Sequence, residues 1–235
     1  MENEIVLMDP QAGKSLTLKP TSFFDLGVKE RQDLEEWIKD NPDILGTELL
    51  LITSEYDGFD KSDERLDLLA LDSAGKLAII ELKRDVSRSL ADLQAIRYAA
   101  FCSTMTFEKV VSLYALFAQI DKEAAKKKIQ DFVGDPDFSA IDNKPRIILA
   151  AGSFDDQEVT SCVLWLRSFG VDISCVEITP YQMANDNRII LVPRVIIPLP
   201  EAQAYIVGAE KKGSRGDAAF LDAAVLPREE PADSR

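Results

Sequence analysis

Histidine is absent from this 235-residue chain. Its absence excludes serine and cysteine hydrolases with a histidine base, zinc sites with histidine ligands and nucleases built on a histidine base. A general acid or base must therefore be a carboxylate, a lysine, a tyrosine or a cysteine. A metal site must be rich in oxygen ligands, which favours Mg²⁺ or Mn²⁺.

Cysteines and long apolar runs are scarce. Cys102, Cys162 and Cys175 are scattered without metal-ligand spacing, which indicates a reducing, cytoplasmic compartment. No apolar run approaches the roughly 18 residues of a membrane span, and the opening MENEIV lacks the pattern of a signal segment. We therefore expect no membrane partner. The sequence also has no GxxxxGK[ST] phosphate loop and no GxGxxG motif.

Positive charge is in short supply, since 27 basic residues face 41 acidic ones and the formal net charge is −14. This balance argues against simple affinity for nucleic acids, because lysine and arginine contacts to phosphate normally dominate such binding. A local basic run near the hairpin could still contact phosphates despite the net negative charge. This run consists of Lys83, Arg84, Arg88 and Arg97. The hydrophobic fraction of 46% is enough for the core of one large or two small domains.

Residues 65–84, RLDLLALDSAGKLAIIELKR, predict a β-hairpin. Two apolar runs flank a short turn, and their apolar residues occupy both faces, as in a sheet that is covered on both sides. If residues 73–75 form a three-residue loop, Gly75 takes the left-handed position that such loops favour. Asp72 then lies opposite Lys76, which fixes the register of the whole hairpin.

This register places charged side chains opposite each other inside apolar strands. Asp67 lies directly opposite Glu81, although facing like charges destabilise a strand pair unless a cation lies between them. Lys83 shares a face with Glu81 because side chains alternate along a strand. The pattern therefore predicts two carboxylates and an ammonium group in one patch, with a divalent metal as the reason.

The rest of the chain favours an α/β fold with one central mixed β-sheet and helices on both faces. The expected helices span residues 28–40, 87–102, 107–132 and 156–169, and the third of these segments is either one helix or a pair. The expected strands outside the hairpin span residues 49–55, 146–151, 171–178 and 189–192. The last strand either ends there or runs on towards Ile197 with an edge break at Pro193. The expected domains are an N-terminal hairpin and connector at 1–27, a main domain at 28–206 and a flexible tail at 207–235.

Two helices add polar candidates. Glu30 falls on the apolar stripe of the first helix, one turn before Leu34, whereas Glu35 and Glu36 point well off it. Glu30 is therefore expected to face inward, although a simple first-turn role beside the helix dipole is an equal alternative.

In the helix after the hairpin, Gln94 and Tyr98 are four residues apart and project from one face. They could hold a phosphate or orient a water molecule. The alternative is that Gln94 is solvated and Tyr98 is an aromatic residue at the rim of the core.

The order of these features resembles the PD-(D/E)XK nuclease superfamily, which has a restriction-endonuclease-like core. That order is an acid-bearing helix, a strand with aspartate, a hairpin, a Glu-X-Lys strand and a Gln-X-X-X-Tyr helix. The strings ERQDLEEWIKDNPDILG, ERLDLLALD, LAIIELKRD and LQAIRYAAF are similar to its NucS-like and RecB-like branch, over residues 28–101. The second half of the chain is similar more loosely. Leu66 replaces the proline that usually precedes the aspartate.

The resemblance implies a Mg²⁺- or Mn²⁺-dependent nuclease, an endonuclease acting on DNA, with RNA left open. Asp67 and Glu81 would bind the metal together with the backbone carbonyl of Leu82. Glu30 would complete the acidic cluster through water or metal, with Glu35 and Glu36 as competitors for that role.

The resemblance also implies roles for the other polar residues. Lys83 would orient or deprotonate the attacking water and stabilise charge on the phosphate, and Gln94 and Tyr98 would position that phosphate. The family commonly forms dimers, so a homodimer stays open although no interface stripe is visible. Two alternatives remain: a catalytically inactive nuclease-fold module that binds nucleic acid or protein, and a purely structural α/β domain with surface ion pairs.

Overall fold

The computed structural model of this chain describes residues 4–11, 13–56, 65–86, 91–183 and 188–199. The predicted flexible tail at residues 207–235 lies outside them. The chain divides into two units, Met1–Ile197 and Pro198–Arg235, and the fold described below belongs to the first. The predicted domain boundaries remain predictions.

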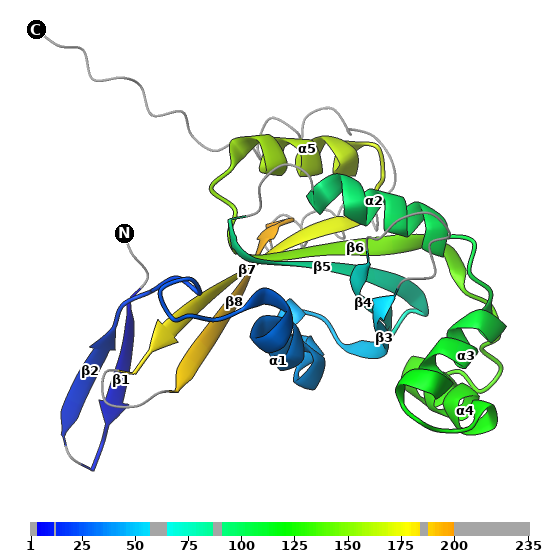
Figure 1. Cartoon of the computed structure of the whole chain (residues 1–235), viewed down its shortest axis with the longest axis horizontal. Helices are drawn as coiled ribbons and strands as arrows, with labels where there is room; N and C mark the ends of the chain where they lie inside the picture. The colour runs from blue at the N-terminus through cyan, green and yellow to red at the C-terminus, as the bar shows by residue number, and fades with distance from the viewer. Residues whose placement is uncertain (1–3, 12, 57–64, 87–90, 184–187, 200–235) are drawn as a thin grey trace, which may run out of the picture. The chain divides into compact units, whose positions relative to one another are not determined.

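A six-stranded mixed sheet forms the centre of the first unit, in the order β3-β4-β5-β6-β7-β8 (Figure 1). Its strands are β3 (Leu49–Tyr56), β4 (Leu66–Asp72), β5 (Lys76–Val86), β6 (Asp142–Ser153), β7 (Ile173–Gln182) and β8 (Ile189–Ile197). The three strands β5, β6 and β7 run parallel, and the pairs on either side of them are antiparallel. The predicted mixed sheet is confirmed.

Helices cover both faces of this sheet. They are the π-helical turn η1 (Glu30–Leu34), α1 (Glu35–Asp40), the 3₁₀ turn η2 (Pro42–Leu45), α2 (Ala91–Cys102), α3 (Phe107–Phe117), α4 (Lys122–Val133) and α5 (Gln157–Ser168). One apolar cluster joins the sheet to α2, α3, α4 and α5, and a second joins its other face to η1, α1 and η2. Figure 1 shows α2 and α5 on the side of the sheet away from α1. The predicted α/β architecture is therefore confirmed.

The β4–β5 hairpin has the predicted register. Its paired residues run from Leu71↔Leu77 to Leu68↔Ile80. Gly75 has a φ of 79°, the left-handed conformation expected at this position. The Asp72 carboxylate closes the turn, because its Oδ1 accepts hydrogen bonds from the backbone N–H groups of Ala74 at 3.0 Å and Lys76 at 2.9 Å.

The predicted N-terminal hairpin is also confirmed, as β1 (Ile5–Asp9) and β2 (Lys14–Leu18). The structure decides two features that the sequence left open. The segment 107–132 is a pair of helices, α3 and α4, separated near Gln119, whose φ is 54°. Strand β8 runs on through Pro193 to Ile197, because β8 is an edge strand, where a missing N–H is tolerated. None of the helices in the described residues is both long and apolar enough for a membrane crossing.

Candidate active site

The predicted acids of the hairpin lie just beyond the last pair of its ladder, Leu68↔Ile80. Asp67 comes from β4 and Glu81 from β5. The backbone N–H of Leu82 donates a hydrogen bond of 2.8 Å to Oδ2 of Asp67, which ties the aspartate side chain to the neighbouring strand. Burial raises the pKa of Asp67, although this hydrogen bond opposes the shift. The sequence therefore placed these two residues correctly.

Glu81 is the most constrained acid of the site, with only 3% of its surface exposed. Its Oε1 accepts from Lys83 Nζ at 2.9 Å, whereas its buried Oε2 has no hydrogen-bond partner among the described residues. Burial, followed by repulsion from Asp67, raises the pKa of Glu81 to about 7. A buried carboxylate with an unpaired oxygen is costly, so this position demands either a proton or a cation.

Lys83 lies on the predicted face. Its Nζ lies 2.9 Å from Glu81 Oε1 and 3.8 Å from Glu30 Oε1. Burial alone would lower the pKa of Lys83, but the surrounding carboxylates, Glu81 first, outweigh burial and raise it. Lys83 is therefore an ammonium group near neutral pH. Of its two predicted roles, this state fits a hydrogen-bond donor to water or phosphate and not a base.

Glu30 reaches the site from η1. Its Oε2 accepts a hydrogen bond of 2.8 Å from the backbone N–H of Arg84, which follows Lys83 on β5. The inward orientation predicted for Glu30 is therefore confirmed, and its side chain remains 38% exposed. Four predicted residues thus meet here: Glu30, Asp67, Glu81 and Lys83.

The prediction that Glu35 points away from the apolar stripe was wrong, because Glu35 is only 3% exposed. The chain forms a π-helical turn from Glu30 to Leu34 before α1 begins, so the faces of a regular α-helix do not apply across it. The buried stripe consists of Leu34, Glu35 and Ile38, while Trp37 is only partly buried. Glu36 is exposed, as expected.

The environment of Glu35 links it to the site. Burial raises the pKa of Glu35 despite its ion pair with Lys39 at 3.3 Å, and the Asp67 and Glu55 carboxylates raise it further. Glu35 therefore lies close enough to Asp67 for their charges to interact. The sequence contained only a weak signal, since Glu35 follows Leu34 but precedes Glu36, and the π-helical turn decides which side of the helix is buried.

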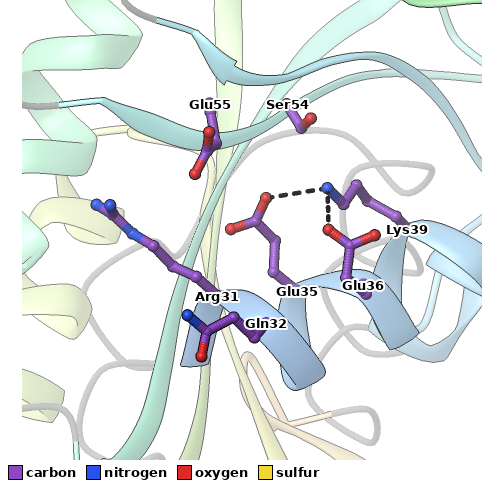
Figure 2. Close-up of a pocket in the computed structure, with 7 residues that line it drawn as sticks. All are labelled: Arg31, Gln32, Glu35, Glu36, Lys39, Ser54 and Glu55. Carbon is purple, nitrogen blue, oxygen red and sulfur yellow. Dashed lines mark ion pairs between the residues drawn. The ribbon is translucent and has the colours of Figure 1, made fainter. Parts of the chain in front are cut away.

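An open hollow of about 560 Å³ lies beside these acids (Figure 2). Its lining residues come from η1, α1 and the end of β3: Arg31, Gln32, Glu35, Glu36, Lys39, Ser54 and Glu55. Figure 2 shows Glu35 between the Arg31 and Lys39 side chains, with Glu55 above it on β3. Glu55 has a φ of 46°, a conformation that non-glycine residues rarely adopt outside constrained positions.

Gln94 and Tyr98 both lie on α2, but the structure does not bring Tyr98 to the rim. The Tyr98 side chain is 2% exposed and belongs to the apolar cluster beneath α2, which contradicts the alternative of a rim aromatic. Gln94 is partly buried. Their predicted contact with a phosphate remains a prediction.

The donor set fits a hard divalent cation. Asp67 and Glu81 supply carboxylate oxygens, their pKa values are raised by burial, and Glu81 Oε2 lacks a partner within the described chain. In the parts of the chain that the structure describes, however, no three acidic or cysteine side chains form a ready-made metal cluster. Ion binding would therefore require Lys83 to release Glu81 or the acids to move together.

No family model and no curated protein matches this chain. A solved structure of the EndoMS-dsDNA2 complex aligns with 75% of this chain at 14% sequence identity and a TM-score of 0.30. This chain spans 65% of the length of that one. A TM-score at this level supports no argument about this protein, so its function must be inferred from its own residues.

Proposed function

We propose that this protein is a Mg²⁺- or Mn²⁺-dependent nuclease that hydrolyses phosphodiester bonds of DNA as an endonuclease. The single observation that supports the proposal most is the convergence of Asp67, Glu81 and Lys83 on neighbouring strands. A buried acid and a half-buried acid, both with raised pKa values, are unfavourable beside each other in a purely structural sheet. The same three groups suit a site for a metal ion and a phosphate.

Asp67, Glu81 and the backbone carbonyl of Leu82 are the residues that would hold the ion, with Glu30 as a further ligand directly or through water. Aspartate, glutamate and carbonyl oxygens match the ligand preference of Mg²⁺ and Mn²⁺. When bound, such an ion supplies a Lewis acid for the phosphoryl oxygens and lowers the pKa of a bound water. The resemblance to the PD-(D/E)XK superfamily supports the same assignment.

Lys83 would stabilise the negative charge that develops on the phosphate. In hydrolysis the water oxygen bonds to phosphorus and gives up a proton to solvent, the ester P–O bond breaks, and the leaving oxygen takes up a proton from solvent. Negative charge builds on the phosphoryl oxygens. The protonated Nζ of Lys83, which lies 2.9 Å from Glu81 without metal, would be released by a bound ion and could then donate a hydrogen bond to those oxygens. Glu30 would keep the chain in position, because it fixes the backbone immediately after Lys83.

The decisive assay is cleavage of circular single-stranded, circular duplex and branched DNA, and of RNA of matched sequence, with Mg²⁺, Mn²⁺ or EDTA. We expect metal-dependent cleavage of a circle, which identifies an endonuclease, and its loss in Glu81→Ala and Lys83→Ala. Lys144→Ala is the matched control, because Lys144 is exposed at the end of β6 away from the site. Cleavage that persists in both site variants would contradict the proposal.

A catalytically inactive module is the second candidate, and one observation favours it: Lys83 pairs with Glu81 where a metal would be expected. Calorimetric titration with Mn²⁺ separates the two candidates. An active site should bind Mn²⁺ much more tightly in the wild type than in Glu81→Ala. An inactive module should bind it equally weakly in both.

A further inference from the structure

We propose that the hollow beside Asp67 receives the nucleic-acid strand on one side of the cleaved bond, and that Arg31 contacts a phosphate of that strand. This inference rests on the proposed nuclease function and adds a substrate-positioning residue to it. Arg31 lies in η1, directly after Glu30. The same helical turn would therefore contact both the reacting centre, through Glu30, and the neighbouring nucleotide, through Arg31.

The hollow adjoins the reacting centre directly. Arg31 directly follows Glu30, whose Oε1 lies 3.8 Å from Lys83 Nζ, and Ser54 in the wall of the hollow pairs with Leu68, the residue next to Asp67. The volume of about 560 Å³ is in the range of about 300–1,000 Å³ that is typical of ligand sites. Arg31 and Gln32, which line the hollow, are both exposed to solvent.

Arg31 differs in its pairing from the neighbouring cations Lys39, Arg65, Lys83 and Arg84. Each of those four has a carboxylate partner; the pairs are Lys39–Glu35 at 3.3 Å, Lys39–Glu36 at 2.6 Å, Arg65–Glu55 at 3.4 Å, Lys83–Glu81 at 2.9 Å and Arg84–Asp85 at 2.5 Å. Arg31 lines the hollow and forms no ion pair within the described residues. An incoming anion can therefore engage its guanidinium group without first displacing a carboxylate.

The distribution of charge decides where a phosphate can lie. Glu35 and Glu55 repel a phosphate from the floor and the β3 wall, so the phosphate is confined to the Arg31 side. A planar guanidinium can grip phosphate oxygens with two parallel hydrogen bonds. The remaining wall, with the acids, Gln32 and Ser54, offers acceptors to the N–H and O–H groups of a base or sugar.

The test compares Arg31→Gln, Arg31→Lys and the control Lys144→Gln in steady-state cleavage and in binding of fluorescein-labelled DNA. Binding is measured with Ca²⁺ in place of the catalytic metal, between about 50 and 200 mM salt. For Arg31→Gln we expect KM and Kd to rise about tenfold with kcat nearly unchanged, and the salt dependence of log Kd to fall by about one phosphate contact. Arg31→Lys should recover the salt dependence but only part of the affinity.

The outcomes separate this inference from the proposed function. If Glu81→Ala abolishes cleavage while Arg31→Gln keeps wild-type KM, Kd and salt dependence, Arg31 does not contact the strand and the inference is wrong. A fall in kcat at unchanged KM would also overturn it, because Arg31 would then act on the reacting centre. If the wild type neither binds nor cleaves DNA or RNA, the proposed function fails and the inference fails with it. Calorimetry with Mn²⁺ should be the same for Arg31→Gln and the wild type.

Discussion

Glu81 should make the metal-free protein lose stability as the pH rises, which is the reverse of the usual behaviour of an acid. Its pKa is raised from 4.5 to about 7 in the folded state. A raised pKa means that the folded protein binds the proton more tightly than the unfolded chain does. The stability linked to this proton is fully present below pH 4.5 and is lost as the pH rises through about 7.

The magnitude follows from the shift. Each pKa unit corresponds to about 1.4 kcal/mol, so the shift of Glu81 amounts to about 3 kcal/mol of unfolding free energy. Asp67 shifts in the same direction and adds to the effect. Lys83 does not contribute in this window, because its pKa is raised from 10.5 and it stays charged throughout.

The perturbation is Glu81→Gln, which removes the titrating group while its amide oxygen can still accept from Lys83. With EDTA present, urea unfolding at a series of pH values between about 4 and 8 should show wild-type stability falling by about 3 kcal/mol. The Glu81→Gln profile should be flatter, and the variant should be the more stable protein at the alkaline end. Glu123→Gln, a change in the first turn of α4, should retain the wild-type profile.

Addition of Mg²⁺ extends this test. An ion that binds only the folded state should restore stability to the wild type at about pH 8 and give little to Glu81→Gln. Parallel profiles for the wild type and Glu81→Gln would refute the reasoning, because they would show that Glu81 is not held in a desolvated position beside another carboxylate.

Three further predictions concern single residues. Asp67→Leu should unfold at the same or higher urea concentration than the wild type without metal but should lose DNA cleavage, since it removes a half-buried acid and a proposed metal ligand together. Lys83→Gln should lose cleavage while Mn²⁺ affinity, measured by calorimetry, is retained or increased, because a competing cation is gone. Gly75→Ala should lower the free energy of unfolding by about 1–3 kcal/mol, because φ is 79° and the added Cβ would lie 2.5 Å from the Phe138 ring.

The sequence predicted the hairpin well because its register depends on local information. A three-residue turn with Gly75 and an Asp72 side chain that binds the turn backbone together fix which residues face each other. Once this register is set, the approach of Asp67 and Glu81 follows from the alternation of side chains. Such short-range rules apply whatever the rest of the chain does.

The sequence could not predict features that depend on packing between distant segments. The burial of Glu35 follows from a π-helical turn and from the side on which the helix packs against the sheet, and neither is visible in a regular periodicity. The hollow at the end of β3 forms where η1, α1 and that strand meet, so it cannot be predicted from the sequence of any one segment. The four-residue spacing of Gln94 and Tyr98 shows only that both lie on one face of the helix. It does not show that Tyr98 packs into the apolar cluster between α2 and the sheet.

The most direct test of the account is anomalous diffraction from crystals soaked with Mn²⁺ at about pH 8, above the pKa of Glu81. The account predicts an anomalous peak shared by the carboxylates of Asp67 and Glu81, with Lys83 Nζ displaced from Glu81. It also predicts that the peak disappears in Glu81→Gln. Fully occupied Mn²⁺ elsewhere, with Lys83 still bonded to Glu81 and no density between the two acids, would contradict it.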